Sequence, residues 1–277
     1  YPQWSPDSKK IAYIDCHLNI WYVDVDAPQG KPVKVDQDLS WLVLGGAELV
    51  PAWSPDSKWL AYARKLTNNL RAIFAYSLAD AKSTQITDGM SDALSPVFDK
   101  DGKYLYFTAS TDVGPSMELD LHRITRQVTS SIYVAVLAKD LPSPLAPESD
   151  EEKAPEEQKS EVRSQKSGEE KKEAAKPTPA EKVEVKIDFD SILQRILAVP
   201  MPPRRYGGLE VAKAGVLLAI EAPAPGVAPS PEPPGFTVHR YDFKLRKSDV
   251  VISGVRSFEV AHNGEKMLYR QGDRWFI

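Results

Sequence analysis

The four histidines of this chain are the side chains best suited to acid–base chemistry, but their spacing does not indicate a catalytic or metal site. They stand singly in the sequence, as His17, His122, His239 and His262. Nucleophilic catalysis places a base next to a serine or cysteine, and zinc hydrolases carry two histidines on one helix face. The sequence contains no Gly-x-Ser-x-Gly elbow, no glycine-rich phosphate loop and no His-Glu-x-x-His motif. We therefore assign no catalytic residue, no metal ligand and no cofactor site.

Two adjacent arginines are the most concrete candidates for ligand binding. Arg204 and Arg205 lie in a turn at residues 202–208, beside Tyr206. A guanidinium group binds a carboxylate through two parallel hydrogen bonds, so the turn is a candidate for holding a peptide carboxylate at the mouth of a channel. The alternative is a solvated loop that leads into a strand. Residues 111–126 are a second candidate, either a docking surface for another domain or an ordinary connecting loop.

Charge and cysteine content exclude several classes of protein. The formal net charge is −4 over 277 residues, and the single cysteine, Cys16, excludes an intrachain disulfide and a four-cysteine zinc site. No apolar run approaches the roughly 18 residues that a membrane span needs. A strongly positive surface for nucleic acid or an anionic membrane is not supported. We expect neither nucleic acid nor a membrane as a partner.

A charged insertion divides the chain. Residues 145–186 contain 12 Asp and Glu and 9 Lys and Arg, with no aromatic residue between Tyr133 and Phe189. Such a segment cannot bury enough apolar surface to offset the entropy of ordering it. The sequence therefore predicts folded parts at 1–144 and 187–277, joined by a disordered insertion at 145–186. A proline-rich stretch at 222–235 is expected to be an extended surface loop.

A repeated motif runs through both folded parts. Pro-Gln-Trp-Ser-Pro-Asp-Ser-Lys at residues 2–9 recurs as Pro-Ala-Trp-Ser-Pro-Asp-Ser-Lys at 51–58 and, more loosely, at 96–103, 209–215 and 258–264. The aligned position falls at Trp4, Trp53, Phe98, Val211 and Val260, with spacings of 49, 45, 113 and 49 residues. The longest spacing is one repeat plus the insertion and further loop residues. A period of about 45 to 49 residues indicates a repeat architecture.

Each repeat has the pattern of four antiparallel strands. An apolar residue precedes a Pro-Asp-Ser or Asp-Gly turn, a second strand such as 59–63 follows, and a third such as 19–25 or 71–76 comes next. A short fourth strand such as 83–87 completes the unit. Four strands in this period are typical of a β-propeller blade. We expect an all-β propeller with about four blades plus three strands of a fifth.

The repeats resemble those shared by TolB, by prolyl oligopeptidase-type propellers and by tricorn-type peptidases. The segments at 84–107, 131–145 and 187–200, with the closing stretch at 258–277, resemble bacterial tricorn protease homologues more specifically. The resemblance implies the second propeller of such an enzyme, part of a seven-bladed ring. It also implies a serine-type peptidase whose PDZ and catalytic domains lie elsewhere in the same polypeptide.

This resemblance sets our functional expectation. We expect a non-catalytic propeller that filters or guides unfolded peptide substrates toward the catalytic domain, in a full-length protein that forms a homo-oligomer in the cytoplasm. A periplasmic location stays open, because a signal peptide upstream of Tyr1 would not be seen here. The alternative function, from a different class, is a TolB-like propeller that binds a partner protein.

Overall fold

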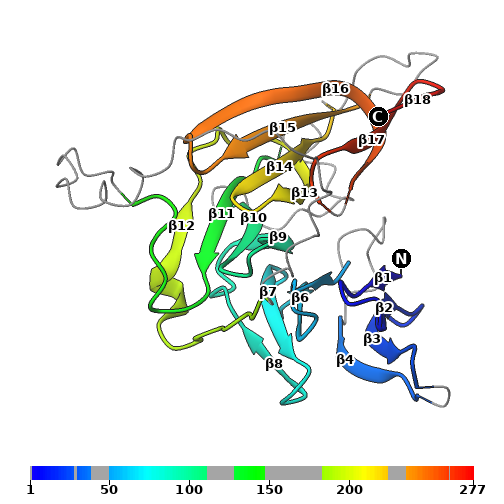
Figure 1. Ribbon diagram of the computed structural model, residues 1–277. Helices are drawn as coiled ribbons and strands as arrows, with labels where there is room; N and C mark the ends of the chain where they lie inside the picture. The colour runs from blue at the N-terminus through cyan, green and yellow to red at the C-terminus, as the bar shows by residue number, and fades with distance from the viewer. Residues whose placement is uncertain are drawn as a thin grey trace, which may run out of the picture. The chain divides into compact units, whose positions relative to one another are not determined.

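A computed structural model describes residues 2–27, 30–38, 50–110, 128–146, 183–223, 235–261 and 263–277. Apart from Ala146, the described residues belong to one compact unit of antiparallel β-sheets (Figure 1). The insertion that the sequence predicts at 145–186 and the proline-rich loop at 222–235 lie mostly outside the described residues. So does the candidate docking segment at 111–126.

The first three sheets have four strands each, in chain order, as the repeat predicts. Blade 1 contains β1 (Gln3–Trp4), β2 (Lys10–Ile14), β3 (Asn19–Asp24) and β4 (Val33–Gln37). Blade 2 contains β5 (Ala52–Trp53), β6 (Trp59–Lys65), β7 (Arg71–Ser77) and β8 (Lys82–Gln85). Blade 3 contains β9 (Asp92–Phe98), β10 (Tyr104–Ser110), β11 (Ser131–Val136) and β12 (Ile196–Ala198), with the short 3-10 helix η3 (Ile192–Arg195) before β12.

The fourth sheet departs from the expected separation into a fourth blade and a partial fifth. It has six strands: β13 (Tyr206–Lys213), β14 (Val216–Glu221), β15 (Phe236–Asp242), β16 (Lys247–Val260), β17 (Met267–Gln271) and β18 (Arg274–Phe276). The first part of β16 pairs with β15 and the rest pairs with β17, so one strand of 14 residues serves both repeats. Gly254 permits this continuity, because its φ of +73° bends the strand. At the same point the chain passes close to Gly235, where a Cβ would meet the backbone of Gly254 at 2.3 Å.

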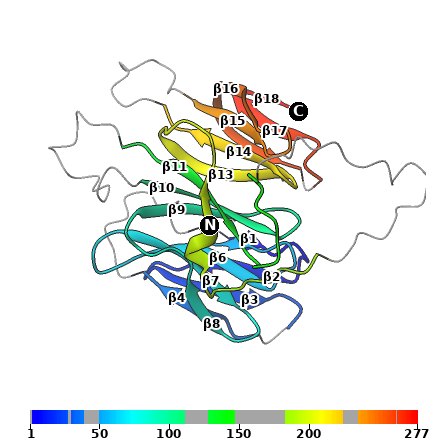
Figure 2. The same cartoon turned by 90° about the vertical axis from the view of Figure 1, so that its left-hand side faces the viewer.

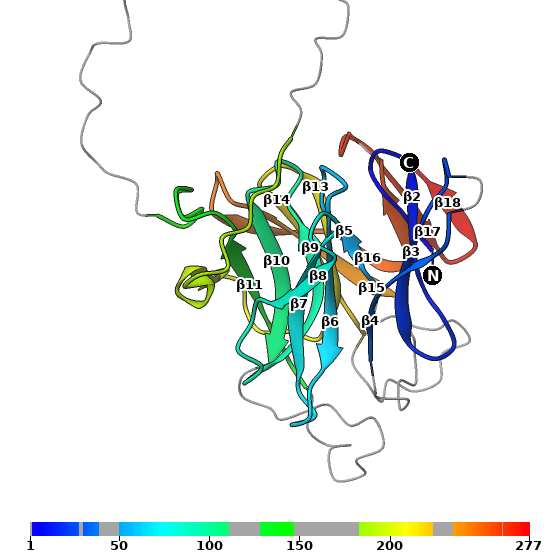
Figure 3. The ribbon, with the colours of Figure 1, turned by 90° about the horizontal axis from the view of Figure 1, so that it is seen from below.

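Successive sheets pack face to face through three apolar clusters. Ile20 of blade 1 shares a cluster with Leu60 of blade 2, and Ile73 of blade 2 shares one with Leu105 of blade 3. Tyr106 of blade 3 packs with Leu217 of the fourth sheet in the third cluster. The sheets can be followed in chain order from blue to red in Figure 2, and Figure 3 shows β6, β7, β10 and β11 beside one another. Inner strands buried on both faces read as continuous apolar runs, as in Trp59-Leu60-Ala61-Tyr62-Ala63.

The repeated Ser-Pro-Asp-Ser motif is a turn that joins the first two strands of a blade. In blade 1 the Ser5 hydroxyl donates to Asp7 Oδ1 at 2.5 Å and accepts from the Lys10 N–H at 2.9 Å. In blade 2 the Ser54 hydroxyl makes the same two bonds, to Asp56 Oδ1 at 2.5 Å and from the Trp59 N–H at 2.9 Å. The buried serine thus satisfies one backbone amide and fixes the turn.

The chain returns to the folded unit at Val183, a few residues earlier than composition predicts. Val185 is buried, its N–H donates to Asp56 Oδ2 at 2.9 Å, and its carbonyl accepts from Trp59 Nε1 at 3.2 Å. Composition places these residues in the insertion because they follow a long Glu- and Lys-rich run. The alternation of apolar and charged residues in Val183-Glu184-Val185-Lys186-Ile187 is what lets one face of this segment pack.

Candidate functional site

The turn that carries the two arginines is held by the backbone of Ser130, the residue just before β11. The Ser130 N–H donates to the Arg204 carbonyl at 2.8 Å, and the Arg204 N–H donates to the Ser130 carbonyl at 3.1 Å. The Tyr206 hydroxyl donates to the Pro202 carbonyl at 2.8 Å. Both prolines of the turn are exposed, and they favour an extended backbone here. The turn is therefore an ordered connection from β12 to β13.

The arginine side chains contact the far end of the β14 strand. Arg204 Nη1 lies 3.1 Å from Glu221 Oε2 and 3.3 Å from Oε1, while Arg205 Nη1 donates to the Pro223 carbonyl at 3.0 Å. Arg204 is half-buried and its charge is balanced by Glu221; Arg205 is exposed. Because a guanidinium has five N–H donors, Arg205 keeps donors for a ligand. The peptide-carboxylate role of Arg204 and Arg205 stays a prediction.

A buried histidine completes this cluster, and sequence reasoning did not connect it to the arginines. His239 Nε2 lies 2.7 Å from Glu221 Oε2, and the histidine is 6% exposed. On adjacent strands Glu221 pairs with Thr237, two residues before His239, so the two side chains share one face as diagonal neighbours. The pairing register of β14 and β15 brings these side chains together, and the sequence alone does not determine that register across the proline-rich connection.

Electrostatics make Glu221 the centre of this cluster. Burial alone would raise its pKa, but the hydrogen bond with His239 and the positive charge of Arg204 hold the pKa of the Glu221 carboxyl below its usual value. The carboxylate is therefore ionised at neutral pH. Glu221 thus bonds to His239 of β15 and pairs with Arg204 of the turn, so this polar network links β14, β15 and the turn before β13.

Of the other histidines that sequence reasoning weighed, only His17 lies among the described residues, and it is apart from this network. His17 is exposed, with its Nδ1 3.5 Å from Cys16 Sγ, and His122 and His262 lie outside the described residues. In the described part of the chain no group of three or more His, Cys, Asp or Glu side chains is placed to hold a metal ion. None of the described helices is long and apolar enough to span a bilayer.

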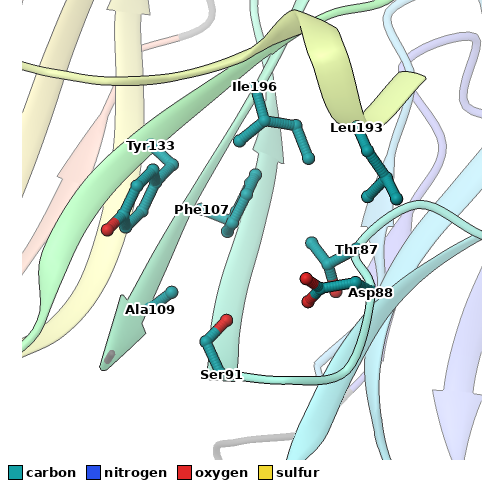
Figure 4. A pocket seen from close by; sticks show the side chains of 8 residues that line it. All are labelled: Thr87, Asp88, Ser91, Phe107, Ala109, Tyr133, Leu193 and Ile196. Atoms are coloured by element: carbon teal, nitrogen blue, oxygen red, sulfur yellow. The ribbon is translucent and has the colours of Figure 1, made fainter. Parts of the chain in front are cut away.

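A cavity of about 210 Å³ opens between blades 2 and 3. Its wall comes from strands β10, β11 and β12 and from η3, and the loop after β8 covers its side (Figure 4). Phe107 and Tyr133 stack at its base with ring centroids 5.7 Å apart. The full lining consists of Thr87, Asp88, Ser91, Phe107, Ala109, Tyr133, Leu193 and Ile196. Sequence reasoning does not predict this cavity, because its lining comes from four separate segments.

Comparison with known protein families decides the assignment of this repeat array. The model of the tricorn protease second β-propeller domain matches residues 1–277. The chain belongs to this family. The resemblance read from the repeats and from the segments at 84–107, 131–145 and 187–200 is therefore confirmed, as is the β-propeller fold.

Three proteins that resemble this tricorn propeller share 14–24% of its residues over the matched regions. Tricorn protease homolog 1 from Streptomyces coelicolor is 24% identical over 205 residues, which cover 72% of this chain and 18% of that protein. A crystal structure of the tricorn protease matches 98% of this chain with a TM-score of 0.68 and 18% identity. A crystal structure of TolB from Acinetobacter baumannii matches 98% with a TM-score of 0.53 and 14% identity. This chain spans only 18% of the tricorn homologue and 24% of the tricorn protease chain.

Proposed function

We propose that this propeller is a non-catalytic domain of a tricorn-like serine peptidase and guides unfolded peptides toward a catalytic domain elsewhere in the polypeptide. The observation that carries the proposal is the match of the whole chain to the second propeller of a protease. A ring of blades leaves a central channel that passes an extended chain but not a folded protein. The exposed Arg205 offers free guanidinium donors to a peptide carboxylate.

Binding of an unfolded protein tests this proposal directly. We expect the purified protein to bind reduced, carboxymethylated α-lactalbumin and not the native, disulfide-bonded form, as measured by isothermal titration calorimetry. Arg205→Ala should weaken the binding about threefold to tenfold, whereas Arg274→Ala, which removes an exposed arginine of β18, should not. Equal binding of the folded and unfolded forms, or none of either, would refute the filter role.

The second candidate function is a TolB-like module that binds a folded partner protein. The likeness to the TolB structure favours it at the level of fold. Preference for folded over unfolded lactalbumin-sized proteins would favour this candidate.

The setting of the domain is part of the same proposal. We propose partners within one polypeptide, a PDZ domain and a catalytic domain, together with homo-oligomerisation of the full-length protein in the cytoplasm. Mass photometry of the full-length protein tests the oligomer, and cell fractionation tests the compartment. A monomer, or recovery from the periplasm, would contradict the respective statement.

A further inference from the structure

The cavity between blades 2 and 3 has a filled counterpart between blades 1 and 2. The repeat aligns Tyr62 of β6 with Phe107 of β10, 45 residues later, and Arg64 with Ala109. Strand pairing extends the correspondence, because Tyr62 pairs with Phe74 on β7 just as Phe107 pairs with Tyr133 on β11. The two interfaces can therefore be compared position by position.

An arginine fills the counterpart. Tyr62 and Phe74 stack with centroids 5.9 Å apart, and the Arg64 guanidinium lies 4.0 Å from the centroid of the Phe74 ring. Arg64 Nη1 also bonds to Asp36 Oδ2 at 2.8 Å, and the Tyr62 hydroxyl donates to the same oxygen at 2.7 Å. Asp36 belongs to β4, the last strand of the preceding blade. The site is thus a cation held between an aromatic face and a carboxylate.

The cavity has the same aromatic pair and a carboxylate, but it lacks the cation. Phe107 and Tyr133 stack as Tyr62 and Phe74 do, and Ala109 stands where Arg64 would be. Asp88 follows the last strand of the preceding blade and is exposed; its Oδ1 accepts from the Met90 N–H at 2.9 Å. Figure 4 shows the oxygens of Asp88 and Ser91 directed toward the space in front of Phe107. Within the described part of the chain no cation pairs with Asp88.

We propose that this cavity binds the arginine side chain of an extended peptide. The guanidinium stacks on the Tyr133 ring, pairs with the Asp88 carboxylate and donates to the Ser91 hydroxyl. Arginine is favoured over lysine because its planar group stacks on aromatic rings and pairs with carboxylates at the same time. The cavity of about 210 Å³ suits one long side chain, since pockets for drug-sized ligands hold roughly 300–1,000 Å³.

This site goes beyond the proposed function, because it adds a residue-specific contact that a general filter for unfolded chains does not require. It also differs from a purely apolar pocket. The walls contributed by Leu193 and Ile196 would accept an aliphatic side chain, but such a ligand would leave the Asp88 carboxylate and the Ser91 hydroxyl without a partner.

Filling the cavity from within gives the first test. Ala109→Arg should raise the melting temperature, because the new guanidinium lies over Tyr133 and beside Asp88, as Arg64 lies over Phe74 and beside Asp36. In an Asp88→Asn background the gain should fall by at least half, while Asn keeps the acceptor for the Met90 N–H. Asp26→Asn, at an exposed turn, is the matched control. Loss of folding in Ala109→Arg, or a gain independent of Asp88, would overturn the proposal.

Peptide binding gives the second test. A fluorescein-labelled peptide, Gly-Ser-Gly-Arg-Gly-Ser-Gly, should bind saturably in a fluorescence anisotropy titration. We expect at least tenfold weaker binding with leucine in place of its arginine, with Asp88→Asn, and with Ala109→Arg, but unchanged binding with Asp26→Asn. Equal binding of the leucine peptide would identify an apolar-side-chain site, and no saturable binding would show an empty cavity; either result overturns the proposal. This experiment does not use unfolded lactalbumin, so its result and the result of the lactalbumin experiment are independent tests of the arginine site and of the filter role.

Discussion

Blades 2 and 3 have the same backbone turn between their first two strands, but different side chains stabilise it. In blade 2 the buried Ser54 hydroxyl donates to Asp56, whereas in blade 3 the equivalent positions are Asp99 and Asp101. Asp99 is 1% exposed and accepts from the Gly215 N–H of the next sheet at 3.1 Å. Two carboxyl groups share a turn in which blades 1 and 2 place a hydroxyl and a carboxylate, so Asp99 reproduces the serine bond only when it carries a proton.

The environment of Asp99 favours that proton. Burial first, and hydrogen bonding with Asp101 second, raise the pKa of Asp99 to about 7, whereas the pKa of Asp101 is lowered. Burial, and after it the charges of Asp99 and Asp101, also raise the pKa of Tyr106. The comparison shows that a repeat can keep its backbone turn while it exchanges a fixed hydroxyl for a group that titrates near neutral pH.

The largest expected effect comes from the glycine of the blade 3 turn. Gly102 has a φ of +73°, as Ser57 has 60° in blade 2, but a Cβ on Gly102 would meet Val185 Cγ2 at 2.6 Å. Gly102→Ser should therefore lower the free energy of unfolding by about 2–3 kcal/mol through overpacking and backbone strain. Urea denaturation measures it. An unchanged midpoint would mean that serine and glycine turns are interchangeable in this fold.

The pH dependence of Asp99 is the next largest effect. Because its pKa is raised in the folded state, its contribution to stability is fully present below the unfolded value near 3.8 and is lost as the pH rises through about 7. Asp99→Asn cannot ionise, so the variant should gain stability relative to the natural protein between pH 5 and pH 8, by about 2 kcal/mol. Calorimetric melting at both pH values measures this gain.

The control for this prediction is Asp26→Asn, which alters an exposed carboxyl. Its melting temperature should follow the natural protein at both pH values. Parallel pH profiles for Asp99→Asn and the natural protein would contradict protonation of Asp99.

Removing the serine of blade 2 should cost less. Ser54→Ala leaves the Trp59 N–H without its 2.9 Å acceptor and Asp56 without one donor, in a position that is fully buried. We expect a loss of about 1 kcal/mol, the usual size for one buried hydrogen bond, and no change of that loss between pH 5 and pH 8. A loss that grows with pH would show that the serine turn also contains a titrating group.

Removing the lysine of either turn should have the smallest effect on stability, but the two variants should differ in the pH dependence of stability. Lys58 pairs with Glu184 at 3.3 Å, and both side chains are exposed, so Lys58→Ala should change stability by less than about 0.5 kcal/mol. Lys103 lies 2.8 Å from Asp101, beside the carboxyl pair. Lys103→Ala should move the loss of stability to higher pH, because removing a positive charge near Asp99 raises the pKa of Asp99 further. Identical pH profiles for the two variants would refute this assignment.

The sequence predicts the blades well because each repeat carries its own strand and turn pattern. The Trp-Ser-Pro-Asp-Ser motif locates β1, β2, β5 and β6, and the Asp-Gly turn locates β9 and β10. It does not predict the continuity of β16, because Gly254 reads equally as the break between two blades. The repeat period therefore does not predict whether a bend at a glycine separates two strands or lies within one continuous strand.

The candidate sites were less accessible to sequence reasoning. The Arg204 and Arg205 turn was found because both arginines are adjacent in the chain, but their partner Glu221 and its neighbour His239 come from strand pairing. Aligning the repeats does show Arg64 replaced by Ala109. Whether such a replacement leaves a cavity depends on how neighbouring segments close over it, which only the packed structure shows.

The segment that follows the insertion determines which blade first receives a mechanical force applied to the chain before Val183. Val185 is bonded to Asp56 and Trp59 of blade 2, whereas the strand it leads to, β12, belongs to blade 3. A load applied at the end of the insertion therefore reaches the turn of blade 2 before it reaches the edge of blade 3. Mechanically, Val185 anchors the incoming chain to blade 2 just before it enters blade 3, so a force entering at Val183 strains the junction of these two blades first.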